Sequence, residues 1–161
     1  MTADVGLLDT SVVIDLHLID PHFLPRELSI SVITMTELVT GPLATTDPRE
    51  RARRQDVLQR IESLVDPIPF DITCVRAYCH VVAAALSSGK RRTRLRSTDL
   101  LIAATAAALG VPLFTKNPKD FSDLSSVIEV IDPSVGNCRP AQVSITTGTI
   151  IGRRFVRSET N

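Results

Sequence analysis

Five side chains with carboxylate or amide oxygens, carried by four separate stretches of the sequence, have suitable chemistry for a divalent-cation site. They are Asp9, Glu37, Asp99, Asn117 and Asp120. Two carboxylates about 4 Å apart repel each other by about 1 kcal/mol in water and by about 4 kcal/mol at an effective dielectric of about 20. A cation would offset that cost, and Mg²⁺ and Mn²⁺ prefer carboxylate, amide and water oxygens. Such an ion could orient a water, lower its pKa and offset the charge on a reacting phosphodiester.

Each of these residues also has a purely structural explanation, and both interpretations stay open for most of them. Thr34 and Glu37 have the spacing of a capping box, in which the glutamate bonds the backbone at the start of a helix. Asp99 stands in a predicted first helical turn, where the helix dipole favours a carboxylate by roughly 0.3–1 kcal/mol. Asp120 suits an ordinary turn. The structural explanation is weakest for Asp9, because it directly follows an apolar strand that needs no charge to end it.

Histidine and cysteine form no metal-ligand pattern in this sequence. The three histidines make no paired set and no HExxH motif, so a zinc site has little support. The three cysteines make no CxxC pair, and we expect them to be buried packing residues in a reducing cytoplasm. These residues are His17, His22, His80, Cys74, Cys79 and Cys138.

The composition indicates one globular domain with an uneven distribution of charge. The 161 residues are 43% hydrophobic and carry 18 basic against 18 acidic side chains, which is typical of a soluble domain. We expect no membrane span, since no apolar stretch approaches about 20 residues, and no secretory signal. Residues 1–46 hold six acids and one base, whereas residues 72–98 hold six bases and no acid. The basic run 90–96 precedes Asp99 and is either a contact for a polyanion or a solvated loop.

Strands and helices alternate along the predicted chain, and this order places the candidate residues near strand ends. Predicted strands cover 5–8, 29–33, 68–70, 111–115 and 126–131; predicted helices cover 12–19, 34–41, 48–64, 72–86 and 97–109, with a helical turn at 118–121. Such alternation predicts an α/β fold with a mostly parallel sheet and helices on both faces. Ligands of such sheets gather at the carboxyl ends of the strands. We assign 1–133 to this domain and 134–161 to a C-terminal extension, either an extra strand at 143–151 or partly disordered.

The candidate residues lie in four segments whose letters form a recognisable set. The segments are LLDTSVVIDL at 7–16, TELVTG at 36–41, RSTDLLIAATAAALG at 96–110 and PLFTKNPKDF at 112–121. In this order and at this spacing they resemble the signature segments of PIN-domain ribonucleases, in particular the VapC toxins of bacterial toxin–antitoxin pairs. The resemblance extends over about residues 5–133.

The resemblance implies a PIN-like α/β fold, Mg²⁺-dependent or Mn²⁺-dependent cleavage of RNA, a homodimer and inhibition by an antitoxin that inserts into the active groove. It matches Asp9, Glu37 and Asp99 to the three acids of the family, with Asp9 and Asp99 as direct metal ligands and Glu37 orienting metal or water. The fourth position is either Asn117 or Asp120. The hydroxyls of Ser11 and Thr115 match positions that support the acids.

The sequence therefore predicts a cytoplasmic, magnesium-dependent endoribonuclease toxin that cuts RNA with a metal-activated water and is neutralised by an antitoxin. A receiver-like signalling module is the alternative from another class, since it also combines an acidic Mg²⁺ pocket with a lysine after a late strand, here Lys116. That module needs two adjacent acids after its first strand, and Asp4 and Asp9 are not adjacent. A third interpretation is a PIN-like scaffold that binds a partner without cleaving RNA.

Overall fold

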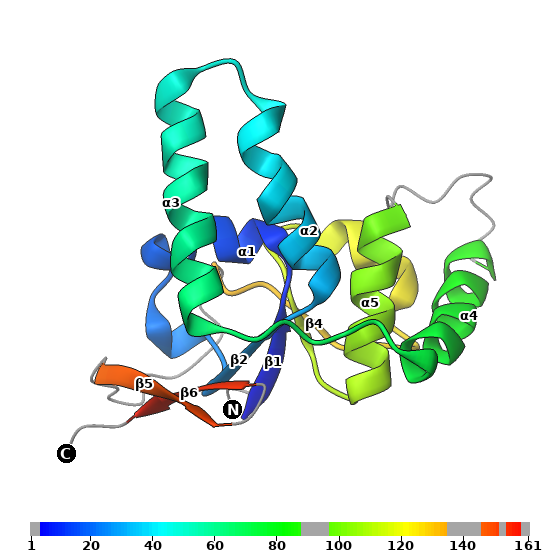
Figure 1. Cartoon of the computed structure of the whole chain (residues 1–161). Coiled ribbons are helices and arrows are strands. Elements are labelled where there is room, and N and C mark those ends of the chain that lie inside the picture. The colour runs from blue at the N-terminus through cyan, green and yellow to red at the C-terminus, as the bar shows by residue number, and fades with distance from the viewer. Residues whose placement is uncertain (1–3, 88–96, 135–145, 152–153, 159–161) are drawn as a thin grey trace.

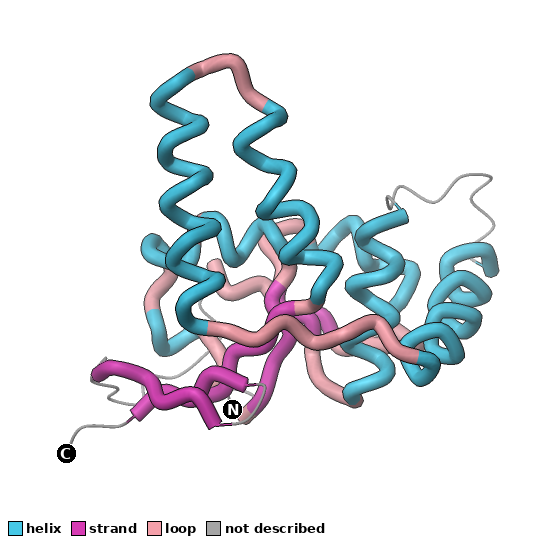
Figure 2. Tube along the Cα trace, in the orientation of Figure 1, coloured by secondary structure: helices cyan, strands magenta, loops and turns pink. Residues whose placement is uncertain are grey.

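The computed structural model describes residues 4–87, 97–134, 146–151 and 154–158. In this part of the chain a six-stranded sheet has the order β4-β3-β1-β2-β6-β5, and helices pack around it (Figures 1 and 2). The strands are β1 (Val5–Leu8), β2 (Glu27–Ile30), β3 (Leu113–Phe114), β4 (Val130–Ile131), β5 (Thr146–Ile151) and β6 (Arg154–Ser158). Strands β1 to β4 run parallel, while β6 pairs antiparallel with β2 and with β5. The predicted mostly parallel sheet is confirmed.

The described helices follow β1, β2 and β3. The α-helices are α1 (Thr10–Ile14), α2 (Val32–Thr40), α3 (Pro48–Leu64), α4 (Ile72–Ser87) and α5 (Ser97–Leu109), and the 3-10 helices are η1 (Leu16–Leu18), η2 (Pro21–Phe23), η3 (Gly41–Ala44) and η4 (Pro118–Leu124). Helices α2 to α5 follow one another without an intervening strand. Helices α2 and α3 form a hairpin that projects away from the sheet (Figure 1). Within the described residues, no helix has the length and apolar character needed to cross a membrane.

Alternate residues of the central strands divide the core into two halves, as the two-residue period of a strand requires. Leu7 and Leu113 belong to the half that is packed against α4 and α5. Their neighbours Leu8 and Phe114 belong to the half that is covered by α1, α2 and α3. Strand β1 therefore ends between two helical layers, and helices from both faces of the sheet lie beside its carboxyl end.

Local capping signals explain why two long helices begin where the sequence predicts. The side chain of Asp47 accepts the backbone N–H of Arg49, and Pro48 occupies the first position of α3. Helix α4 begins after Asp71, whose side chain accepts the backbone N–H groups of Cys74 and Thr73. These hydrogen bonds hold the pKa of Asp71 below its ordinary value.

The first helix and the third predicted strand differ from expectation. Helix α1 begins at residue 10, two residues earlier than predicted, because the Asp9 carboxylate accepts the backbone N–H of Thr10 at 2.8 Å and caps it. The α-helix ends at Ile14, and one 3-10 helix, η1, covers residues 16–18 of the predicted span. The predicted strand at 68–70 is reduced to an isolated bridge between Ile68 and Ser31.

The predictions for the cysteines and for the C-terminal extension are confirmed only in part. Cys74 is buried as expected, whereas Cys79 is exposed on α4, so its prediction as a packing residue is wrong. Strand β5 falls within the predicted 143–151, and its antiparallel partner β6 was not expected. The basic run 90–96 and Cys138 lie outside the described residues.

Candidate functional site

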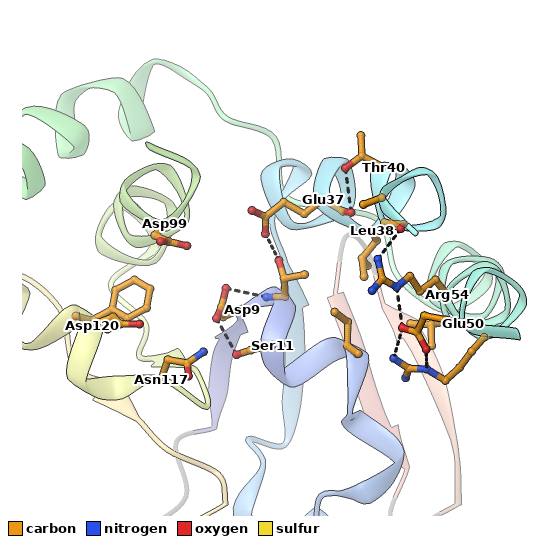
Figure 3. Close-up of a pocket in the computed structure, with 17 residues that line it drawn as sticks. Asp9, Ser11, Glu37, Leu38, Thr40, Glu50, Arg54, Asp99, Asn117 and Asp120 are labelled. Carbon is orange, nitrogen blue, oxygen red and sulfur yellow. Dashed lines mark hydrogen bonds and ion pairs between the residues drawn. The ribbon is translucent and has the colours of Figure 1, made fainter. Parts of the chain in front are cut away.

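A cavity of about 490 Å³ lies beside the carboxyl end of β1. All five candidate residues from the sequence line it: Asp9, Glu37, Asp99, Asn117 and Asp120. In Figure 3, Asp9 lies between Glu37 on one side and Asp99, Asn117 and Asp120 on the other. Four chain segments thus bring carboxylate or amide groups to one cavity. This agrees with the expectation that candidate residues near the carboxyl ends of parallel strands lie close together.

Asp9 is held in place by three donors from two strand ends. Its side chain is buried, and Oδ1 accepts the backbone N–H of Thr10 at 2.8 Å. Its Oδ2 accepts the hydroxyls of Ser11 at 2.8 Å and Thr115 at 2.9 Å. These three hydrogen bonds fix the orientation of the carboxylate. The hydroxyls of Ser11 and Thr115 therefore contact the acid that they were predicted to support.

Glu37 faces the same cavity from α2, and its predicted alternative role as a helix cap is wrong. Helix α2 is capped by Ser31, whose hydroxyl accepts the backbone N–H of Thr34 at 3.0 Å. The Glu37 carboxylate instead accepts the hydroxyl of Thr10 in the first turn of α1. This contact joins α1 to α2 across the cavity and leaves Glu37 beside Asp9 (Figure 3).

The remaining three candidates come from α5 and from the segment after β3. Asp99 lies in the first turn of α5, while Asp120 lies in the first turn of η4. Asn117 precedes η4, and its backbone N–H donates to the hydroxyl of Thr115 at 3.2 Å. Because Thr115 also donates to Asp9, the segment that carries Asn117 and Asp120 is tied to the end of β1.

Lys116, on which the receiver-like alternative depends, turns toward a different acid. Its Nζ lies 2.6 Å from Oδ2 of Asp15, in an ion pair between the segment after β3 and the end of α1. Its backbone N–H donates to the hydroxyl of Ser11 at 3.1 Å. Neither Lys116 nor Asp15 lines the cavity, so the lysine acts here as a tie between two segments.

The donor set suits a hydrated Mg²⁺ by type. The cavity lining offers carboxylate, amide and hydroxyl oxygens, and within the described chain it includes neither histidine nor cysteine. Across the described residues, no group of three or more His, Cys, Asp or Glu side chains is arranged to hold a metal ion. Mg²⁺ usually keeps several waters and binds proteins through one or two carboxylates. Asp9 and Asp99 are two carboxylates of the lining that could supply such ligands.

A second group of charged residues at the cavity was not identified from the sequence. Glu50, Arg53 and Arg54 of α3 also line the cavity. Glu50 and Arg54 lie at the end farther from Asp99 and Asp120 (Figure 3). The three-residue and four-residue spacings from Glu50 are a known pattern of helical ion pairs. That pattern is local and does not indicate where the helix lies in the fold. The α2–α3 hairpin brings α3 beside the acids.

The geometry of this group is well defined. Glu50 accepts Nε of Arg53 at 2.9 Å and Nε of Arg54 at 2.8 Å. Arg54 also donates from Nη1 to the carbonyl oxygen of Gly41 at 2.7 Å, which ties α3 to η3. Hydrogen bonds from Arg53 and Arg54 lower the pKa of Glu50 to about 2.

Comparisons with known proteins agree with the fold and the four segments. The family model of the PIN domain matches residues 6–126. Ribonuclease VapC5 of Mycobacterium tuberculosis is 31% identical over 132 residues, which cover 80% of this chain and 94% of the relative. Ribonuclease VapC8 of the same species is 39% identical over 106 residues, covering 63% and 90%. The crystal structure of VapBC-5 from M. tuberculosis, a toxin–antitoxin system, superposes with a TM-score of 0.69 at 32% identity, covering 80% of this chain and 98% of that one.

Proposed function

This chain belongs to the PIN domain family and, within it, to the VapC ribonucleases of toxin–antitoxin systems, and from that premise we propose that it is a Mg²⁺-dependent endoribonuclease toxin. Mn²⁺ substitutes for Mg²⁺ in this proposal, and the substrate is cellular RNA in the cytoplasm. The observation that carries it is the convergence of Asp9, Glu37, Asp99 and Asp120 on one cavity. A metal ion makes a cavity lined by these acids compatible with a phosphodiester substrate.

The residues divide the work according to how they are held. Asp9 and Asp99 are the proposed direct ligands of the ion, and the three donors on Asp9 keep its oxygens oriented. Glu37 and Asp120 lie on either side of Asp9 (Figure 3). Glu37 would help to orient the ion or the attacking water, together with either Asp120 or Asn117 at the fourth position. When bound, Mg²⁺ lowers the pKa of a water and offsets the charge on the reacting phosphodiester. No covalent bond between enzyme and RNA is required.

A small antitoxin and a second copy of the chain are the proposed protein partners. The antitoxin is supported by the similarity to VapBC-5, whose structure is that of a toxin–antitoxin system. In the proposal it neutralises the toxin by inserting into the active groove. Expressing the chain with the product of a small upstream reading frame, and measuring the mass of the complex by light scattering, tests both partners together.

The decisive experiment compares RNA cleavage by the wild-type chain, Asp9→Asn and Asp99→Asn, each with and without Mg²⁺ or Mn²⁺. We expect cleavage by the wild type only with metal, and loss of cleavage in both variants. Asp66→Asn is the matched control, because Asp66 is exposed and does not line the cavity. Unchanged cleavage in either active-site variant would overturn the assignment. A folded wild type that binds RNA without cutting it would identify the chain as a scaffold.

A further inference from the structure

The cavity continues beyond the acids into a part of opposite charge, which we call the Arg53 arm. Glu50, Arg53 and Arg54 of α3 are its charged residues, and the cavity is also lined by the apolar side chains of Ile14, Leu38 and Val57. One negative and two positive side chains give this group a net charge of plus one, whereas all charged residues of the proposed metal site are acids. Figure 3 shows Glu50 and Arg54 at one end of the cavity and Asp99 and Asp120 at the other.

Arg53 is positioned to bind an oxygen in addition to Glu50. Its Nε and Nη2 donate to the two carboxylate oxygens of Glu50, each at 2.9 Å, in a forked pair. A guanidinium has five N–H donors, so this pair uses two of them and holds the group in one orientation. The Arg53 side chain is 45% exposed. It can therefore reach a ligand while Glu50 holds it.

Arg54 has a different role from its neighbour, although both contact Glu50. Its Nε is bonded to Glu50 and its Nη1 to the carbonyl oxygen of Gly41. These bonds fasten α3 to the hairpin turn at η3 and set the position of the Glu50 carboxylate. Arg54 therefore has a structural role, whereas Arg53 is the arginine whose exposed guanidinium can contact a ligand.

The apolar side chains of the lining offer a surface on which an apolar group can pack. Ile14 and Val57 are partly buried side chains packed against the core beneath α1, α2 and α3, and Leu38 is buried in it. Single-stranded RNA matches this combination of groups, since its phosphates bind cationic side chains and its unstacked bases pack on flat or apolar surfaces. If the scissile phosphate lies at the acids, the adjacent nucleotide must bind in another part of the same cavity.

We propose that the Arg53 arm binds the ribonucleotide next to the scissile phosphate. Arg53 donates to the phosphate of that nucleotide, and its base packs on Ile14 and Val57. This inference rests on the proposed function, and it adds a substrate subsite formed by α1 and α3 to the metal-dependent centre.

The test uses steady-state cleavage of a randomised RNA pool of about 20 nucleotides, a length that exceeds the roughly 4–16 nucleotides bound by common single-strand modules. Arg53→Gln should raise KM by about tenfold and leave kcat within about twofold, since it removes a contact made before and during the reaction. It should also lower the salt slope of RNA binding by about 0.7, the value for one lost phosphate contact on a single strand.

Arg49→Gln is the matched control for long-range charge. Arg49 lies one helical turn before Arg53 on the same helix, is exposed and does not line the cavity. It should leave KM and the salt slope unchanged. Equal effects of the two substitutions, or no effect of Arg53→Gln on KM, would overturn the subsite while the proposed function stands.

A second variant tests the base contact. Val57→Met extends a side chain into the arm, and we expect it to change the nucleotide preference at one position beside the cut, as determined by sequencing the fragments. An unchanged preference would overturn the base contact. Unchanged RNA kinetics in Arg53→Gln with weaker capture of the co-expressed antitoxin would assign the arm to that protein and overturn the proposal. A wild type that cuts no RNA would overturn both the function and the subsite.

Discussion

Thr115, directly after β3, donates a hydrogen bond of 2.9 Å from its hydroxyl to Oδ2 of Asp9, directly after β1. The two residues are 106 positions apart in the sequence. Thr115 is fully buried, and its hydroxyl also accepts the backbone N–H of Asn117. One hydroxyl therefore orients the central acid and the segment that carries the other side of the site.

Thr115→Val removes this hydroxyl and keeps the shape of the side chain. We expect a loss of about 10–100-fold in metal affinity or activity, as for other groups that orient metal ligands, measured by cleavage across a Mg²⁺ titration. Thr105→Val is the control, because Thr105 is equally buried in α5 and bonds the carbonyl of Leu101 instead. A Thr115→Val enzyme with wild-type metal dependence would show that Asp9 needs no such support.

Asp120 and Asn117 compete for the fourth position of the site, and both line the cavity. We expect Asp120→Asn to lower cleavage by at least about tenfold, because it removes a carboxylate beside the proposed ion. Asn117→Asp keeps an oxygen at the same place and should retain cleavage. Single-turnover rates at saturating RNA decide between them. The opposite order, with Asp120→Asn active and Asn117→Asp inactive, would assign the fourth position to Asn117.

Gly6 in β1 is predicted to tolerate no side chain. A Cβ there would lie 2.7 Å from Cδ2 of Phe114 and 2.8 Å from Cγ of Pro25. Because Phe114 is buried in the core, we expect Gly6→Ala to lower the free energy of unfolding in urea by about 1–3 kcal/mol. At Gly41 the nearest atom is 3.8 Å from such a Cβ and the backbone is helical, so Gly41→Ala should be neutral or stabilising by about 0.4–1 kcal/mol.

Features set by neighbouring residues could be predicted from the sequence. Helix α3 begins at Pro48 and ends at Leu64, as expected. Its start could be predicted because Asp47 caps the helix and Pro48 occupies its first position. The meeting of the acids was also predictable, since parallel strands end at one edge of a sheet. Glu37 shows the limit of local patterns. Its spacing from Thr34 suggested a capping box, yet Ser31 supplies the cap.

Features that depend on distant packing could not be predicted in the same way. The pairing of Arg53 and Arg54 with Glu50 follows from helical spacing, but their place in the cavity depends on how the α2–α3 hairpin folds over α1. The tie between Lys116 and Asp15 joins residues 101 positions apart. The same lysine suggested a receiver-like pocket when only its order after a late strand was known.

Glu50 should make the stability of the protein depend on pH in the acid range. Arg53 and Arg54 lower its pKa from 4.5 to about 2 in the folded chain, so its contribution is complete above pH 4.5 and is lost as the pH falls toward 2. Glu50→Gln should therefore be less stable than the wild type at neutral pH, and the difference should shrink over that window. Urea unfolding at a series of pH values measures it. Glu62→Gln, an exposed position on the same helix, is the control, and an equal effect there would refute the role of the arginine pair.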